Sequence, residues 1–325
     1  MAHPTDDRHP FARGWFVVTF SDDAAPGTVR PLRYFGRDLV LFRTAGGTVA
    51  VADAHCPHRG AHLGHGGTID GEGLRCPNHG FCFDAHGACR DAPGHAAPPD
   101  GARLRRWTVQ ERNGIVFVWH DSDGGPPDYA IPPIAELETP EWTRWSHSRL
   151  VVKTQPREIV ENVADVAHFA VVHRFHIDEF ANELTGHTAT QTTRGHGEID
   201  WGEGIKPVTT TATYHGPAYQ VTHLAGQLEA ILINAHTPID ASSLDLFFAV
   251  SVKVASPHAE AIGRAYVDAI RKGFYEDIAI WEHKRWRDAP LLCEGDGPIG
   301  PLRRWYAQFF ARRESPDADR SRDDG

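Results

Sequence analysis

Two stretches of the sequence decide the fold prediction, Cys56-Pro-His-Arg-Gly-Ala-His-Leu63 and Cys76-Pro-Asn-His-Gly-Phe81. Each supplies one cysteine and one histidine from a glycine-containing loop, so the two loops can close around one metal centre. Structural zinc uses the same residue types, but about two to four residues usually separate its paired ligands, and only one residue separates Cys56 from His58. A cluster of two irons, with thiolates on one iron and imidazoles on the other, uses this ligand set. The spacing favours the iron–sulfur cluster, and zinc is the alternative.

The composition of the whole chain agrees with metal chemistry. Its 325 residues include 21 histidines and 9 tryptophans beside only 5 cysteines and 1 methionine. At about 100–200 residues per domain, this length predicts two domains. Lysine and arginine total 33 against 43 aspartates and glutamates, and the resulting net charge of -10 argues against binding to a nucleic-acid backbone.

The sequence predicts neither a secretory signal nor a membrane span. Residues Met1–Pro10 include Asp6, Asp7 and Arg8 and lack the apolar core of a signal peptide. The longest apolar stretches, such as Ile115–Trp119, have the length of a strand and fall far short of the roughly 20 residues needed to cross a bilayer. A cytoplasmic location is therefore expected, in which cysteine serves more often as a ligand or a buried thiol than in a disulfide.

The first part of the chain has the pattern of a small β domain, with short apolar runs separated by glycine, aspartate and proline turns. A concentration of turn formers at Asp121–Asp128 predicts the linker that follows it. The expected domains are 8–122 and 123–313, followed by a charged, disordered tail at 314–325. The strands expected in the first domain are Trp15–Phe20, Leu39–Arg43, Val49–Asp53, Leu104–Gln110 and Ile115–Trp119.

The second part reads as an α+β domain in which helices cover an antiparallel sheet. Apolar residues at helical spacing predict one helix at Glu158–Val172 and a long amphipathic helix at Ala259–Trp286. Between these helices the pattern predicts successive antiparallel strands. These expected strands are Thr209–Tyr214, Tyr219–Leu224, Leu228–Asn234 and Ser243–Val254.

A second group of candidate ligands lies on the first of these helices. Asp165 and His168 are three residues apart and share a helical face, whereas His173 lies five residues beyond His168. Five residues correspond to about 140° around an ideal helix. Both histidines can bind one metal only if the helix distorts or ends between them. From spacing alone, a surface helix with incidental histidines is an equally good interpretation.

The two Cys/His loops resemble the Rieske cluster signature in residue type and spacing. The resemblance implies that Cys56 and Cys76 ligate one iron of a [2Fe–2S] cluster and that His58 and His79 ligate the other. Cys82 and Cys89 lie outside the signature and are expected to be free thiols.

The second group resembles the mononuclear-iron motif of Rieske non-haem iron oxygenases, as Asn162-x-x-Asp165-x-x-His168-x4-His173. Two histidines and one carboxylate leave open positions on Fe(II) for dioxygen. In this family the carboxylate comes from the long C-terminal helix, and the stretch Glu276-Asp-Ile-Ala-Ile-Trp-Glu-His-Lys284 resembles that place. Asp277 is the expected third ligand, with Glu276 and Asp268 as alternatives.

The same resemblance assigns Asp165 an electron-transfer role. In the family this aspartate bridges an iron-binding histidine of one subunit to a cluster histidine of its neighbour, because the two centres of one chain are too far apart. Carried over, His79 of one subunit would contact Asp165 of the next, and Asp165 would contact its own His168. A closed ring of subunits, a homotrimer, is the expected assembly.

The C-terminal part contains three further informative stretches, Asp277-Ile-Ala-Ile-Trp-Glu-His-Lys284, Pro290-Leu-Leu-Cys-Glu-Gly-Asp-Gly-Pro298 and Leu302-Arg-Arg-Trp-Tyr306. Together with Gly14-Trp-Phe16 and the two metal motifs, they resemble the oxygenase component of 3-ketosteroid 9α-hydroxylases and the related cholesterol 7-desaturases. The resemblance covers nearly the whole chain and implies a monooxygenase that hydroxylates or desaturates a hydrophobic, steroid-like substrate with O₂. Electrons would come from a separate NAD(P)H-dependent reductase, directly or through a ferredoxin. The alternatives are an aromatic-ring dihydroxylating dioxygenase and a Rieske electron carrier with an added binding domain.

Overall fold

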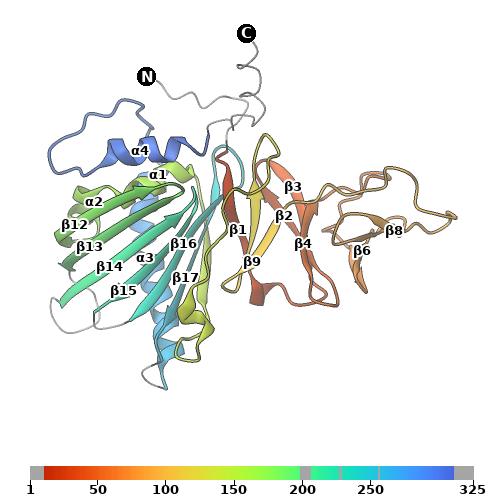
Figure 1. Ribbon diagram of the computed structural model, residues 1–325, viewed down its shortest axis with the longest axis horizontal. Helices are drawn as coiled ribbons and strands as arrows, with labels where there is room; N and C mark the ends of the chain where they lie inside the picture. The colour runs from red at the N-terminus through yellow and green to blue at the C-terminus, as the bar shows by residue number, and fades with distance from the viewer. Residues whose placement is uncertain (1–10, 198–205, 227–228, 255–256, 311–325) are drawn as a thin grey trace, which may run out of the picture.

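The computed structural model describes residues 11–197, 206–226, 229–254 and 257–310. The predictions for the N-terminal ten residues and for the tail at 314–325 lie outside these residues. Within them, no helix combines the length and the apolar character needed to span a membrane. The chain forms two β-rich parts that lie side by side along the longest axis of the molecule (Figure 1).

The N-terminal part consists of three small antiparallel sheets, ordered β1-β10-β9, β2-β3-β4 and β5-β6-β7-β8. The last sheet stands at the far end of the molecule (Figure 1). The strands are β1 (Gly14–Phe20), β2 (Val29–Tyr34), β3 (Arg37–Arg43), β4 (Val49–Asp53), β5 (Thr68–Asp70), β6 (Gly73–Arg75), β7 (Cys82–Asp84), β8 (Cys89–Asp91), β9 (Val109–Arg112) and β10 (Ile115–His120).

Four of the five strands expected here are confirmed, and the prediction for Leu104–Gln110 is wrong over its first five residues. Only β9, from Val109, is a strand. The residues before it make single bridges to two different sheets, Arg103 to Ala88 and Arg106 to Ala52. This segment therefore connects the sheets instead of running along one of them.

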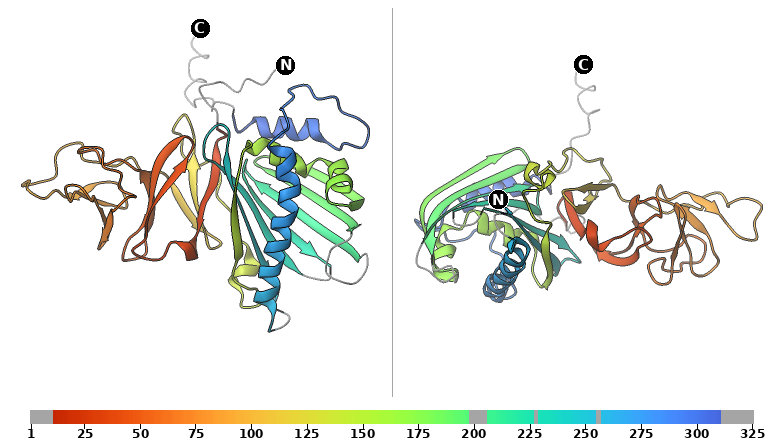
Figure 2. Two further views of the ribbon diagram at one scale, coloured as in Figure 1. Left: turned by 180° about the vertical axis from the view of Figure 1, so that it is seen from behind. Right: turned by 90° about the horizontal axis from the view of Figure 1, so that it is seen from below.

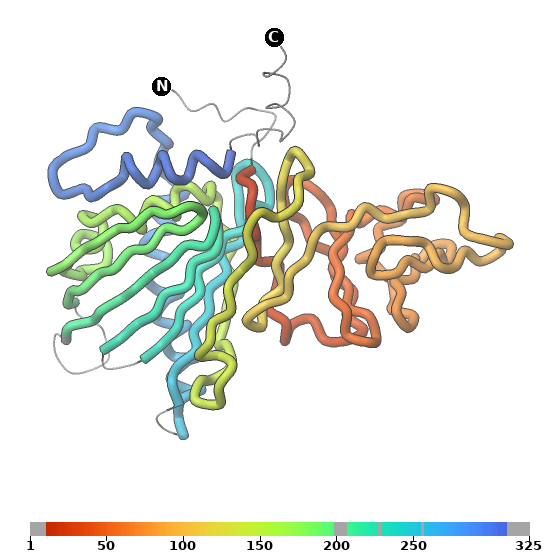
Figure 3. The backbone as a smooth tube through the Cα atoms, in the orientation of Figure 1, coloured from red at the N-terminus to blue at the C-terminus, as the bar shows by residue number. Residues whose placement is uncertain are grey.

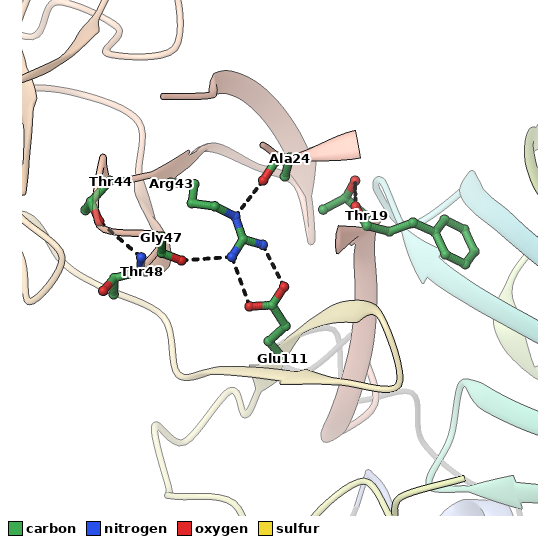
Figure 4. A network of polar contacts seen from close by, with 8 residues as sticks. Thr19, Ala24, Arg43, Thr44, Gly47, Thr48 and Glu111 are labelled. Carbon is green, nitrogen blue, oxygen red and sulfur yellow. Dashed lines mark hydrogen bonds and ion pairs between the residues drawn. The ribbon is translucent and has the colours of Figure 1, made fainter. Parts of the chain in front are cut away.

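A polar network built on Arg43 ties the first two sheets together (Figure 4). The Arg43 guanidinium binds the Glu111 carboxylate through both terminal nitrogens, at 3.1 and 2.6 Å. It also donates to the carbonyl oxygens of Ala24 and Gly47. Arg43 is only 8% exposed, and these bonds offset the free-energy cost of removing its charge from water.

The C-terminal part is built on one seven-stranded antiparallel sheet in the order β11-β17-β16-β15-β14-β13-β12. The chain enters it at the edge strand β11, after a connection that contains Asp121–Asp128 and no strand (Figure 3). The strands are β11 (Ser146–Val152), β12 (Phe175–Thr185), β13 (Thr188–Gly197), β14 (Lys206–His215), β15 (Tyr219–Ala225), β16 (Ala230–Pro238) and β17 (Leu244–Val252).

The four strands expected in this part are confirmed as β14–β17. The sequence pattern did not predict β11, β12 or β13. The β12 strand is half-buried at best, and its sequence Phe175–Thr185 mixes charged with apolar residues. A strand whose side chains face solvent lacks the apolar alternation on which the prediction relied. Two of these strands, β11 and β12, are the outer edges of the sheet, and β13 is the neighbour of β12.

The long helix α3 (Ala259–Trp281) lies on one face of this sheet (Figure 2). It packs on β17 and β11 through a core that includes Phe248, Val267 and Trp281. The helix ends five residues before the predicted Trp286. The apolar stripe stops at Trp281, because Glu282-His-Lys-Arg285 is polar and the Trp286 ring instead lies between two arginines.

The two parts share one hydrophobic core, in which β1 lies against β16 and β15. The Thr237 hydroxyl donates to the Val17 carbonyl oxygen at 2.6 Å. The Tyr34 hydroxyl donates to Asp245 at 2.7 Å. The N-terminal part is therefore held against the sheet by buried contacts from both sides.

Candidate metal centres

The two Cys/His loops fold in the same way. The Cys56 amide donates to the Ala61 carbonyl and the Gly60 amide to the Cys56 carbonyl, and the same two bonds recur at Cys76, between residues 76 and 81 and between 80 and 76. Gly60 and Gly80 both have φ +76°, a left-handed conformation that glycine adopts without strain. The sequence pattern Cys-Pro-x-x-Gly thus dictates the loop locally.

The loops bring together two thiols on one side and two imidazoles on the other. Cys56 and Cys76 are 3% and 4% exposed, and burial together with the neighbouring Cys76 thiol raises the pKa of Cys56 to about 11. The rings of His58 and His79 lie 4.6 Å apart and are exposed at the surface. The Phe81 ring stacks on His58 at 4.6 Å.

The arrangement of the four side chains as a buried thiol pair and an exposed imidazole pair fits a two-iron cluster better than zinc. A tetrahedral zinc site needs all four ligand atoms around one point. Among the described residues, the loop cysteines and histidines form no group of three whose ligand atoms all lie within 4.8 Å of one another. A Rieske cluster needs a thiol pair and an imidazole pair, one for each iron.

The predicted helix at Glu158–Val172 is divided into α1 (Pro156–Val160), a 3-10 turn (Glu161–Val163) and α2 (Val166–Val172). Asp165 starts α2, because its carboxylate accepts the His168 amide at 3.1 Å. The helix ends at Val172, so His173 lies just past it and can turn toward His168. The break predicted between the two histidines is therefore present.

Three side chains from α2, its end and α3 converge on one point. The Nε2 atoms of His168 and His173 lie 3.1 Å apart. Asp277 Oδ1 lies 2.9 Å from the first and 3.4 Å from the second. At a metal–ligand distance of about 2.1 Å, neighbouring ligands at right angles lie about 3.0 Å apart. Asp277 Oδ1 is buried and has no hydrogen-bond partner within the part of the chain that the structure describes, so all three atoms suit a metal ion.

The two alternative carboxylates are less suitable. Glu276 is exposed and approaches His173 only at Nδ1, at 3.6 Å. Asp268 is paired with Arg271 at 3.0 Å. Burial would raise the pKa of Asp277, but the two histidines hold it below its usual value. Burial would lower the pKa of His173, but Asp277 and Glu276 raise it.

Two residues of the motif contact His168 without joining the group of three. Asn162 Nδ2 lies 3.4 Å from His168 Nε2. The carboxylate of Asp165 accepts from the backbone amide of His168, and no bond from Asp165 to the imidazole is found among the described residues. Burial raises the pKa of Asp165.

A cavity of about 230 Å³ adjoins the three converging side chains. Ile159, Phe274 and Trp281 give it apolar walls, and Gln191 and Asn234 contribute amides. Asn234 Oδ1 is buried, and no described residue is its hydrogen-bond partner. Sequence reasoning identified neither amide, since each lies on a sheet strand and carries no motif.

Two strands of the sheet contribute little to this cavity. Within β16 only Asn234 lines it, and no residue of β17 does. The whole of β17 is buried, and its residues belong to the core of the molecule.

Comparison with known proteins gives the class. Residues 14–111 match the Rieske [2Fe-2S] domain family. Residues 118–310 match the family described as 3-ketosteroid 9α-hydroxylase C-terminal domain. The chain therefore belongs to the Rieske oxygenases whose catalytic domain is of the 3-ketosteroid 9α-hydroxylase type, with a [2Fe–2S] cluster and a mononuclear iron as cofactors.

Individual relatives agree with this assignment. A 3-ketosteroid-9-alpha-monooxygenase oxygenase component of Rhodococcus rhodochrous is 37% identical, over 95% of this chain and 84% of the relative. Cholesterol 7-desaturase of Xenopus laevis is 27% identical, over 93% and 72%. The crystal structure of dicamba monooxygenase bound to 3,6-dichlorosalicylic acid has the same fold, with a TM-score of 0.77 at 20% identity over 91% of this chain and 96% of that one. The protein is the oxygenase component of a Rieske monooxygenase.

Proposed function

We propose that Cys56, His58, Cys76 and His79 hold the cluster and that His168, His173 and Asp277 hold the mononuclear iron. The convergence of the last three ligand atoms within 3.4 Å of one another carries this proposal. When bound, the two groups supply one-electron transfer and dioxygen activation. The protein residues hold the groups, exclude water and orient the substrate.

The substrate is proposed to be a hydrophobic, steroid-like molecule that carries an oxygen. The cavity walls Ile159, Phe274 and Trp281 suit an apolar body. The buried Asn234 Oδ1 has no hydrogen-bond partner among the described residues and therefore favours a substrate hydroxyl that donates to it. The amide nitrogen of the same side chain can donate to a substrate carbonyl. Hydroxylation and desaturation both fit this arrangement.

Electron transfer is proposed to run between subunits. The cluster loops and the α2–α3 site lie toward opposite ends of the longest axis (Figure 1). A closed ring, a homotrimer, would bring His79 of one subunit to Asp165 of the next. The electrons enter from a separate reductase, directly or through a ferredoxin, and the proposed location is the cytoplasm.

Metal analysis of single variants tests the iron ligands. We expect Asp277→Ala to lose the mononuclear iron and at least 100-fold in turnover while the cluster absorbance is unchanged, because a buried anionic ligand is removed. Asp268→Ala is the matched control on the same helix and should retain both irons and activity. Glu276→Gln should retain the mononuclear iron. Loss of iron in Glu276→Gln, with retention in Asp277→Ala, would overturn the assignment.

Co-expression of two inactive variants tests the subunit pathway. Asp277→Ala lacks the mononuclear site, and Cys76→Ser lacks the cluster. In random rings, half of the subunits have an intact iron site and half of those have an intact donor neighbour, so turnover should recover to about one quarter of wild type. Transfer within one chain predicts no recovery.

A further inference from the structure

A second cavity lies on the other side of the α1 segment from the iron site. Its volume is about 310 Å³, which is within the usual range for small-molecule sites. It shares no lining residue with the iron cavity. Val160 and Glu161 face it, whereas their neighbours Ile159 and Asn162 face the iron cavity.

The walls of this cavity are apolar and come from α1, α4 (Ile299–Ala307) and the loop between α3 and α4, which curves over the α2 end of the sheet (Figure 3). Leu292, Leu302, Tyr306 and Phe310 are among the apolar lining residues. Leu292 is 47% exposed, so the apolar lining extends to the surface. Such walls would bind a hydrocarbon body by removing it from water.

The charges in the cavity leave a guanidinium without a hydrogen-bonded partner. Of the three lining arginines, Arg303 is bound to Glu161. Asp288 accepts the Trp286 indole N–H at 2.9 Å. The Arg157 guanidinium lies over the Trp286 ring at 4.3 Å, and its Nε is buried with no hydrogen-bond partner among the described residues. Among the lining residues three arginines face two carboxylates. The carboxylate of Glu158, next to Arg157, also favours the charged guanidinium, but it is itself bound by Lys284 at 2.7 Å.

We propose that this cavity is a second binding site, which takes an amphipathic carboxylate whose headgroup is bound by Arg157 and whose hydrocarbon body lies against α4. A carboxylate can accept two N–H bonds from one guanidinium, and such charge-assisted bonds are stronger than neutral ones. Burial lowers the pKa of Arg157, and a bound anion would offset this desolvation. The site is independent of the iron ligands, so its failure would leave the proposed function intact.

Calorimetric titration of the metal-loaded full-length protein with decanoate tests the site. We expect saturable binding to one site per chain and weaker binding of decan-1-ol, which has the same chain without the charge. Arg157→Gln should weaken decanoate binding at least tenfold, since it removes the paired charge. Arg157→Lys should weaken it less, because the charge stays but the two-pronged geometry is lost.

A second variant keeps the proposal falsifiable if Arg157→Gln is poorly folded. Ala307→Trp fills the cavity from α4 without touching the charge, and it should abolish decanoate binding. Arg264→Gln, on the exposed side of α3, is the control for a lost surface charge and should bind normally. Asn234→Leu alters the iron cavity and should also bind normally.

Three results would overturn the proposal. The first is the absence of saturable decanoate binding to the wild type up to millimolar concentrations. The second is equal affinity for wild type and for folded Arg157→Gln or Ala307→Trp. The third is loss of binding in Asn234→Leu, which would place decanoate in the iron cavity.

Discussion

The two metal regions of the chain are built in opposite ways. The cluster loops are 20 residues apart from Cys56 to Cys76, and both imidazoles face solvent. The proposed iron site joins α2 to Asp277, which lies 109 residues beyond His168 and is 4% exposed. One region is assembled by local hydrogen bonds and the other by packing of a helix on a sheet.

This difference matches what each site does in the proposed function. Exposed imidazoles allow another protein or subunit to approach the cluster edge, whereas the burial of Cys56 and Cys76 protects the thiolate side from water. The iron ligands adjoin a cavity in which water can be replaced by substrate. Electron entry requires that another protein can reach the cluster histidines, and oxidation of an apolar substrate requires a site from which water can be displaced.

The largest expected effect is the loss of the cluster in a variant that keeps the mononuclear iron. Cys76→Ser removes a cluster ligand, so visible absorbance and turnover should both be lost while the mononuclear iron is retained, measured by iron content and absorbance. Cys89→Ser is the control, because Cys89 lies outside the loops and is a free thiol. A Cys76→Ser protein with an unchanged spectrum would mean that the cluster is held elsewhere.

A smaller effect concerns the residue proposed to join the regions. Asp165→Asn keeps the helix cap, since asparagine caps as well as aspartate, but removes the negative charge. Turnover with the reductase should fall by about 10- to 100-fold while both metal contents stay constant. Asp165→Ala should in addition lower the free energy of unfolding by about 1 kcal/mol. Full turnover in Asp165→Asn would reduce Asp165 to a helix cap.

A separate effect, on stability instead of turnover, contrasts the exposed histidines of the cluster loops with one that is fully buried. His236 is 0% exposed, its ring nitrogens have no hydrogen-bond partner among the described residues, and burial lowers its pKa to about 3. The unfolded chain binds a proton on this residue below about pH 6.5, whereas the folded chain does not. The contribution of neutral His236 to the free energy of unfolding is therefore fully present above about pH 6.5. As the pH is lowered toward 3, this contribution falls by up to about 1.4 kcal/mol per pH unit.

Denaturant unfolding across this pH range measures the contribution. His236→Leu should flatten the acid limb relative to wild type. His283→Leu changes an exposed histidine and should leave the slope unchanged. An identical slope in wild type and His236→Leu would show that His236 is not the residue that titrates.

The apolar strands and helices were predictable in proportion to their burial. All seven residues of β1 and all nine of β17 are buried, and their apolar runs identified both. The edge strand β12 and its neighbour β13 bury too little apolar surface to produce a pattern. The spacing of His168 and His173 required the helix to distort or end between them if both bind one metal, and the structure places that end at Val172.

The sequence by itself determined the cluster loops, because Cys-Pro-x-x-Gly forms its own hydrogen bonds within six residues and needs no distant partner. The resemblance of its second motif also indicated the two histidines that are proposed to share an iron. Only the tertiary structure decided that Asp277 reaches them instead of Glu276, since one residue along α3 turns the carboxylate from solvent into the cavity. The same holds for Asn234 and for Arg157, whose surroundings come from strands and helices far away in the sequence.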